Sequence, residues 1–333
     1  MTARPILTIS CLLAALCLLK AEASEWEKLP PLPEANGGFA CGVDHGRVVV
    51  AGGTHWVNGE KKWLSSVHLF DPVKKQWKTS GLELPSPMAY GVAGHSKKGL
   101  VFGDAFVFAG GATGTGGFES QGWLEGHGHL VLRQGLPKTQ PVVLAAGGMM
   151  GEKLLFVGGT PDAADLASLT KSAFALNADG QIEPLPDYPG QPIGIAASAT
   201  VGEQLFIFGG AHWDAAKHVV VNTSDAYAFA LKTKIWRKLP SFPYAVRGLT
   251  AVALNDDLIY LAGGFKNDAE GFTDEAFLYD LQKNEYRPAR PLPYKAMVGL
   301  VVCDGQIYCL GGEDKQKSRT DACFRMPVAD LIK

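Results

Sequence analysis

The sequence predicts an all-β fold, a six-bladed β-propeller whose ring is closed by an N-terminal strand that completes the last blade. Forty glycines and 20 prolines separate short runs rich in Val, Ile, Phe and Tyr, a composition typical of many strands joined by turns. An apolar run that ends in two glycines recurs at intervals of roughly 50 residues, the period of a repeat architecture. The glycine pairs are Gly52-Gly53, Gly110-Gly111, Gly158-Gly159, Gly209-Gly210, Gly263-Gly264 and Gly311-Gly312.

Each unit contains the sequence signals of three strands, often followed by a fourth strand that carries a Trp. In the first unit these are a Gly/Ala-rich segment at 37–43, the run 47–53, an aromatic segment at 67–72 and a strand around Trp77. Four short strands per unit are typical of a propeller blade. The second unit is the least regular, because its glycine-rich stretch 112–135 lacks a clean Trp strand.

The two ends of the chain predict how the ring closes. The last unit has no Trp-type fourth strand before Lys333, whereas residues 25–30 (Glu-Trp-Glu-Lys-Leu-Pro) match residues 235–240 (Ile-Trp-Arg-Lys-Leu-Pro). We therefore expect residues 25–30 to form the missing strand, which leaves no unpaired sheet edges.

Residues 1–23 have the pattern of a secretory signal peptide. Arg4 precedes an apolar stretch and a small-x-small cleavage site, Ala21-Glu22-Ala23. The apolar stretch ends at Lys20, short of the about 20 residues that span a membrane. We expect a periplasmic or secreted protein without a membrane segment after signal removal, with residues 24–333 forming a single propeller domain.

Charge and metal-ligand patterns exclude several functions. The formal net charge of −2 provides no electrostatic footprint for nucleic acid or an anionic membrane. His127 and His129 lie two residues apart, but no third ligand is indicated. No metal and no cofactor are therefore expected.

Four cysteines remain after signal removal: Cys41, Cys303, Cys309 and Cys323. An even count in an exported protein permits disulfides, with three possible connectivities. Each cysteine lies in an apolar run, however, where a free thiol behaves as a small buried hydrophobe. Mostly free thiols are favoured.

The loop after the last glycine pair is the main candidate site. It carries Glu313 directly after Gly312, and Arg319 six residues later. Loops that leave the second strand of a propeller blade gather at the central mouth, where ligands bind. Without other information, the two charges can equally form a solvated salt bridge worth under about 1 kcal/mol.

Glycine pairs, a third-strand aromatic and a fourth-strand Trp resemble the kelch repeat over essentially the whole mature chain. Residues 312–322, Gly-Glu-x-Lys-x-x-x-Arg-Thr-Asp-Ala, resemble the signature of the N-acetylneuraminate epimerase (sialic acid mutarotase) family, and segments 37–53 and 89–92 agree with it. The signature lies in the last blade, which is similar to the cyclically permuted branch of that family. The resemblance implies conversion of α- to β-N-acetylneuraminate, with Glu313 as proton acceptor and Arg319 as its partner.

Mutarotation requires a base for the anomeric hydroxyl proton and an acid for the ring oxygen. Glu313 can act as the base. The planar fork of Arg319 suits a sugar carboxylate, so a small-molecule sugar is the expected partner.

Equivalent loops supply further substrate-binding candidates. His55 and Trp56 follow one glycine pair, and His212 with Trp213 follows another; each combines a titratable ring with a stacking surface. The other candidates lie in loops that enter a first strand: Asn36, Tyr90, Arg247 and Lys295.

Two alternatives remain open. Met88 stands where the resemblance has an arginine, so the substrate can be another sugar or sugar acid. Kelch folds also host non-catalytic modules that bind proteins or glycans.

Overall fold

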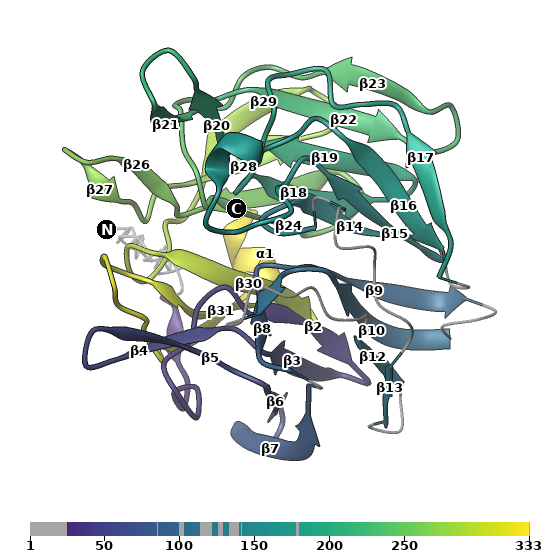
Figure 1. Cartoon of the computed structure of the whole chain (residues 1–333). Coiled ribbons are helices and arrows are strands. Elements are labelled where there is room, and N and C mark those ends of the chain that lie inside the picture. The colour runs from purple at the N-terminus through teal and green to yellow at the C-terminus, as the bar shows by residue number, and fades with distance from the viewer. Residues whose placement is uncertain are drawn as a thin grey trace, which may run out of the picture.

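A computed structural model describes most of the chain (Figure 1). The described residues are 25–84, 86–99, 103–113, 122–125, 129–132, 140, 142–177 and 180–332. The predicted signal peptide, residues 1–23, and His127 of the histidine pair lie outside them.

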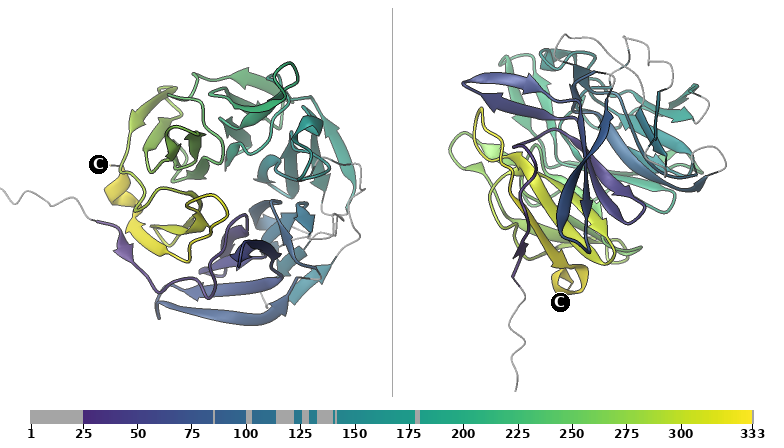
Figure 2. Two further views of the ribbon diagram at one scale, coloured as in Figure 1. Left: turned by 60° about the vertical axis from the view of Figure 1, so that its left-hand side comes forward. Right: turned by 90° about the horizontal axis from the view of Figure 1, so that it is seen from below.

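Four-stranded antiparallel sheets are arranged around a common centre, as the left view of Figure 2 shows. Blade A contains β2 (Ala40–Asp44), β3 (Arg47–Ala51), β6 (Ser66–Asp71) and β7 (Gln76–Glu83). Blade B contains β14 (Ala146–Met150), β15 (Lys153–Val157), β16 (Ala173–Asn177) and β17 (Ile182–Leu185). Blade C contains β18 (Ala197–Val201), β19 (Gln204–Phe208), β22 (Ala226–Ala230) and β23 (Ile235–Lys238).

Two further blades follow the same order. Blade D contains β24 (Thr250–Ala253), β25 (Leu258–Ala262), β28 (Ala276–Asp280) and β29 (Glu285–Pro288). Blade E contains β30 (Met297–Cys303), β31 (Gln306–Glu313), β32 (Cys323–Pro327) and β1 (Glu27–Lys28). The all-β propeller predicted from the sequence is confirmed.

The structure establishes these five blades, one fewer than the six that the sequence predicts. The second unit also holds a four-stranded sheet, formed by β9 (Val92–Gly99), β10 (Gly103–Ala109), β12 (Gly122–Glu125) and β13 (His129–Leu132). The connections around β12 and β13 fall outside the described residues. This is the glycine-rich stretch without a clean Trp strand. Its sequence therefore carries weaker strand signals than the other units do.

Short hairpins extend from the blades after the glycine pairs. The hairpin strands are β4 (Thr54–Val57) with β5 (Glu60–Trp63), β20 (Ala211–Asp214) with β21 (Val219–Asn222), and β26 (Phe265–Asn267) with β27 (Gly271–Phe272). In the second unit β8 (Met88–Ala89) pairs with β11 (Ala112–Thr113). The helices are η1 (Leu166–Ser168) and α1 (Val328–Leu331). Neither these nor any other helix of the described residues is long and apolar enough to cross a membrane.

The predicted pairing of the N-terminal strand with the last blade is present. Glu27 and Lys28 of β1 pair with Arg325 and Phe324 of β32, and the purple N-terminal segment lies beside the yellow C-terminal blade (Figure 2). Glu27 also forms ion pairs with Lys75 of blade A and with Arg325. Hydrogen bonds from Lys75 and Arg325 hold the pKa of Glu27 below its usual value.

Tryptophan side chains join β1 to the blades on either side. Trp26 Nε1 donates to the Pro291 carbonyl of blade D at 2.8 Å, and Trp77 Nε1 of blade A donates to the Pro30 carbonyl at 3.1 Å. Trp236 of blade C makes the same bond to Pro186 at 2.8 Å. For Trp77 and Trp236, the acceptor is the proline of the Leu-Pro pair in the preceding blade.

The hydrophobic core lies between the sheets. Second strands such as β15 and β25 are buried almost completely, because both of their faces are covered by neighbouring blades. All four cysteines are free, as the sequence favoured, and burial raises the pKa of Cys41 to about 12 and that of Cys303 to about 11.

Candidate functional site

Glu313 owes its position to the glycine pair before it. Gly311 and Gly312 have φ angles of 45° and 107°, and a Cβ on Gly312 would lie 2.1 Å from the Met297 carbonyl oxygen. Only glycine fits this turn. It bends the end of β31 so that Glu313 pairs with Met297 at the start of β30.

Other units place uncharged residues at the position of Glu313. The residue after each glycine pair bridges to the segment that enters the first strand, as in Gly37 with Thr54, Val143 with Thr160, Gly194 with Ala211, and Arg247 with Phe265. Glu313 therefore departs from the repeat with a carboxylate, a sign of a function beyond folding.

A chain of backbone hydrogen bonds forms the floor of the central cavity. Its members are the consecutive entry residues Gly38, Tyr90, Leu144, Ile195 and Gly248, all with φ between 57° and 71°. From Tyr90 onward, each donates its N–H to the carbonyl of the preceding member at 2.8 to 3.0 Å. The entry segments of five consecutive units are therefore hydrogen-bonded to one another where they line the cavity.

The cavity has a volume of about 1000 Å³. Its walls include apolar side chains such as Phe39, Phe265 and Phe272, which offer large apolar surfaces to a ligand. The charged and amide-bearing lining residues are Lys61, Arg247, Asp268, Glu313, Gln316 and Arg319. This size and this mixture suit a polar small molecule.

Glu313 and Arg319 form an ion pair in the cavity wall, with 3.0 Å between Glu313 Oε2 and Arg319 Nη1. The Arg319 side chain is only 4% exposed, whereas the Glu313 side chain is 31% exposed. The carboxylate therefore faces the cavity, and the guanidinium lies behind it.

Arg319 is fixed by residues that are distant in sequence. Its Nε donates to Thr54 Oγ1 at 3.2 Å and its Nη2 donates to the Tyr90 hydroxyl at 3.3 Å. Its Nη1 also donates to the Ser318 carbonyl at 2.7 Å. A Cβ on Gly37 would lie 2.4 Å from Arg319 Cδ, so Gly37 leaves the space through which this side chain passes.

Arg247 lines the cavity from the side of blade D. Its guanidinium lies 4.3 Å from the centre of the Phe265 ring, and its Nη1 donates to Asn222 Oδ1 at 2.9 Å. Burial lowers the pKa of Arg247, while the negative charges of Asp268 and Glu313 act in the opposite direction. Arg247 and Glu313 therefore lie within electrostatic reach of each other.

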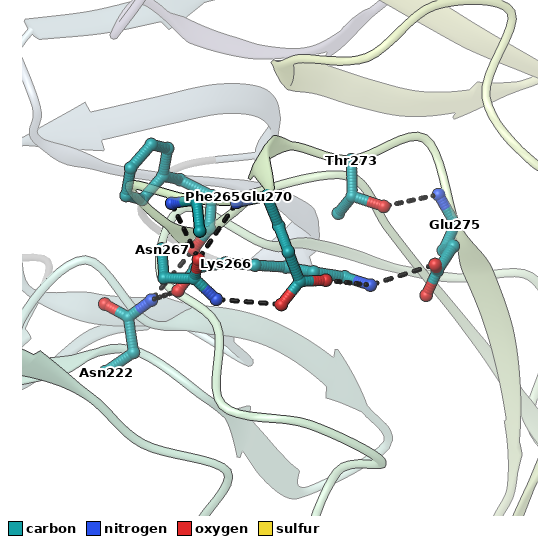
Figure 3. Close-up of polar contacts among 8 residues, drawn as sticks. Asn222, Phe265, Lys266, Asn267, Glu270, Thr273 and Glu275 are labelled. Carbon is teal, nitrogen blue, oxygen red and sulfur yellow. Dashed lines mark hydrogen bonds and ion pairs between the residues drawn. The ribbon is translucent and has the colours of Figure 1, made fainter.

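The β26–β27 hairpin that carries Phe265 and Phe272 is firmly anchored (Figure 3). Asn222 Nδ2 donates to the carbonyls of Phe265 and Lys266 at 2.9 and 2.6 Å. Lys266 in turn forms ion pairs with Glu275 at 2.9 Å and with Glu270 at 3.4 Å. This wall of the cavity is held by contacts from blade C and from within blade D.

Of the residues predicted from the sequence, Glu313, Arg319, Tyr90 and Arg247 line the cavity. The remaining candidates are not among the described residues that line it: Asn36, His55, Trp56, His212 and Lys295. His55 Nδ1, Trp56 Nε1 and His212 Nδ1 are buried atoms without a hydrogen-bond partner in the described structure. Lys295 is exposed.

Asn36 supports the Glu313 loop through its own buried contacts. It is 1% exposed, and its Nδ2 donates to the Gly52 carbonyl at 2.8 Å. Its backbone carbonyl accepts from Gly312 N–H at 2.7 Å. Asn36 thus connects the glycine turns of blades A and E.

Sequence reasoning missed several lining residues. Phe265 follows a glycine pair as Glu313 does, so comparison of repeat positions would have found it. Lys61 and Asp268 lie in hairpins that individual blades insert, and the repeat pattern carries no signal for them. Lys61 Nζ lies 4.7 Å from the centre of the Tyr90 ring, a cation–π contact at the cavity wall.

Metal ligands do not gather around the cavity. Within the described ranges, no group of three or more His, Cys, Asp or Glu side chains has metal-binding geometry. The lining side chains supply two carboxylates, two guanidiniums, an ammonium group, an amide and a phenol.

Comparison with known proteins supports the kelch-type reading of this propeller. Residues 35–80 match the family model of the Kelch motif. The chain is 32% identical to mouse (Mus musculus) Kelch-like protein 35, over 52% of this chain and 27% of that protein. It is 25% identical to N-acetylneuraminate epimerase of Yersinia pestis (strain Pestoides F), over 52% of this chain and 53% of that protein.

Fold, glycine pairs and motif together define a kelch-type β-propeller with a charged central cavity. The matches span about a quarter of the mouse protein and about half of the bacterial epimerase. The similarity to N-acetylneuraminate epimerase is distant, at 25% identity.

Proposed function

We propose that this protein is a mutarotase that interconverts the α and β anomers of N-acetylneuraminate. The observation that carries the proposal is the Glu313–Arg319 pair, with the carboxylate facing a sugar-sized cavity and the guanidinium buried behind it. The distant similarity to N-acetylneuraminate epimerase supports the same reaction.

In the proposed mechanism, Glu313 takes the proton of the anomeric hydroxyl while the bond between the anomeric carbon and the ring oxygen breaks. The same proton is then delivered to the ring oxygen, which gives the open-chain ketone. Rotation about the adjacent carbon–carbon bond presents the other face, and the reverse proton transfers close the ring. Arg319 positions the carboxylate, since Thr54 and Tyr90 hold its guanidinium.

The test is to follow the anomers of sialidase-released α-N-acetylneuraminate by NMR with purified protein. Glu313→Gln keeps the shape of the side chain and removes the base, so the turnover rate is expected to fall by about 10²- to 10⁴-fold. Arg319→Lys loses the planar fork that holds Glu313 and is expected to lower the rate as well.

Glu285→Gln is the matched control, because Glu285 is an exposed carboxylate on β29. It should turn over like the wild type. An absence of acceleration over buffer by the wild-type protein would exclude the proposed activity.

A non-catalytic kelch module is the second candidate, and the similarity to Kelch-like protein 35 favours it. Such a module would use the cavity or its hairpins for binding, and Glu313→Gln would then change affinity without any turnover to lose. A mutarotase acting on another sugar is the alternative that Met88 raised in the sequence, because it stands where the resemblance has an arginine. Met88 is only 6% exposed and packs in the blade A core, so this position contributes no side chain to the cavity.

We further propose that the second unit forms a sixth blade and that β1 closes the ring. The β9–β13 sheet, the strand pairing of β1 with β32 and the Trp26 and Trp77 hydrogen bonds support this architecture.

Export is a separate proposal, supported by the pattern of residues 1–23. Cleavage after Ala23 predicts that the mature protein begins at Ser24. Mass spectrometry of the protein recovered from the periplasm or medium tests this, and an intact N-terminus would contradict it.

A further inference from the structure

Arg319 has little capacity left to bind a substrate. A guanidinium carries five N–H donors. Thr54, Tyr90, Ser318 and Glu313 already accept hydrogen bonds or form an ion pair with Arg319. Because the side chain is only 4% exposed, Arg319 cannot present a free fork to a sugar carboxylate, as the sequence suggested it would.

Arg247, in contrast to Arg319, has guanidinium N–H groups left to bind a ligand. It lines the cavity, and among the described residues its guanidinium makes one hydrogen bond, to Asn222. The Phe265 ring covers one face of the guanidinium, which leaves its edge and the remaining N–H groups for a ligand. A half-buried cation with unfilled donors is costly unless an anion binds to it.

The repeat supports a functional role for Arg247. Equivalent entry positions, each directly before a residue with positive φ, carry Gly37, Ala89, Val143 and Gly194. A charge at this position is therefore an exception to the blade pattern, as Glu313 is at its own position. Both exceptions line the same cavity, so both can contact one bound molecule.

We propose that Arg247 binds the carboxylate of an anionic sugar and thereby selects 2-keto sugar acids, whose carboxylate is attached to the anomeric carbon. This inference rests on the proposed mutarotase function. In a 2-keto sugar acid, the carboxylate and the reacting hydroxyl share one carbon. A base and an anion-binding group that line one cavity fit that arrangement, whereas a uronic acid carries its carboxylate on C5, across the ring oxygen from the anomeric carbon.

Affinity measurements test this role directly. Calorimetry would compare N-acetylneuraminate with its uncharged C1 amide, using wild-type protein and Arg247→Gln. Loss of a charge-assisted, bidentate contact is expected to weaken binding of the acid by about 10- to 100-fold, while the affinity for the amide changes less than about twofold. Arg247→Lys should restore part of the affinity for the acid, because it keeps the charge without the fork.

Arg237→Gln is the matched control, since Arg237 lies on β23 and its Nη1 donates to Asn284 at 3.2 Å, outside the cavity. It should bind both ligands as the wild type does. Kinetically, Arg247→Gln should raise KM for the acid with little change in kcat, whereas Glu313→Gln lowers kcat.

Equal weakening of acid and amide binding in Arg247→Gln, or unchanged binding of both, would overturn the inference, as would wild-type protein that does not prefer the acid. Binding of the acid through Arg247 without acceleration of mutarotation would leave the inference standing and remove the proposed function. Normal mutarotation with an unchanged KM in Arg247→Gln would support the proposed function and overturn the inference about Arg247.

Discussion

Single residues at the cavity divide into those that face it and those that hold these residues in place. Glu313 and Arg247 present functional groups to the cavity, while Thr54 and Asn36 are fully buried behind it. Thr54 Oγ1 donates to the Gly37 carbonyl at 3.0 Å and accepts from Arg319 Nε. The orientation of Arg319 in its ion pair with Glu313 therefore depends on the Thr54 hydroxyl, which comes from blade A.

Thr54→Val tests this dependence, because it keeps the shape of the side chain and removes the acceptor of Arg319. We expect turnover to fall by about tenfold as Arg319 and Glu313 lose their orientation, together with about 1 to 3 kcal/mol of stability for a buried donor left unpaired. Anomer NMR and thermal unfolding would measure the two effects.

Thr160→Val is the control at the equivalent repeat position of blade B. Thr160 Oγ1 bonds to Asp162, Asp165 and Ser168, and no hydrogen bond joins it to an arginine in the part of the chain that the structure describes. It should lose comparable stability with normal turnover. Equal activity losses in the two variants would show that the effect is one of general stability.

At the scale of the element, the glycine turn after each second strand places the next residue beside the segment that enters a first strand. Gly52 and Gly53 have φ angles of 64° and 107°. A Cβ on Gly53 would lie 1.9 Å from Asn36 Oδ1. The turn therefore requires glycine both for its backbone conformation and for the space that Asn36 occupies.

Comparing Gly53→Ala with Gly59→Ala separates these two requirements. Gly59 has a φ of 80° with no atom within 4 Å of an added Cβ, so alanine there adds only backbone strain of about 1 to 2 kcal/mol. Gly53→Ala adds the collision with Asn36, and we expect a larger loss, by a further 1 to 3 kcal/mol or so. Chemical denaturation would give both free energies of unfolding, and equal losses would argue against the packing role of Asn36.

At the scale of the whole molecule, stability depends on how the blades are joined. Each fourth strand that carries a Trp near a Leu-Pro pair is linked to the blade before it, as Trp236 is to Pro186. Strand β1 makes these links in both directions. Although short, β1 therefore connects blades A, D and E.

Deleting residues 25–30 is expected to lower the melting temperature by about 10 °C or more. The deletion removes buried Leu29, worth roughly 2 to 5 kcal/mol, and two tryptophan hydrogen bonds of about 1 kcal/mol each. Trp236→Phe, which removes one such bond within the ring, should lower it by only about 2 to 4 °C. A melting temperature unchanged by the deletion would contradict closure of the ring by β1.

The sequence by itself determined the strands, the glycine turns and the pairing of β1 with the last blade. These features are local or repeat from unit to unit: apolar runs form buried strands, glycine pairs accept positive φ, and residues 25–30 match the Trp strand of another unit. The sequence also identified Glu313 and Arg319, because both lie in one loop next to a glycine pair.

Only the tertiary structure decided which side chains meet at the centre. Arg319 contacts Thr54 and Tyr90, more than 200 positions away, and the contact exists because blades A and E, which come from opposite ends of the chain, pack against each other. His55 and His212 follow glycine pairs as Glu313 does, yet they lie one residue further along paired hairpins and do not line the cavity. Side chains alternate between the two faces of a strand, so a shift of one residue separates a cavity residue from a packing residue.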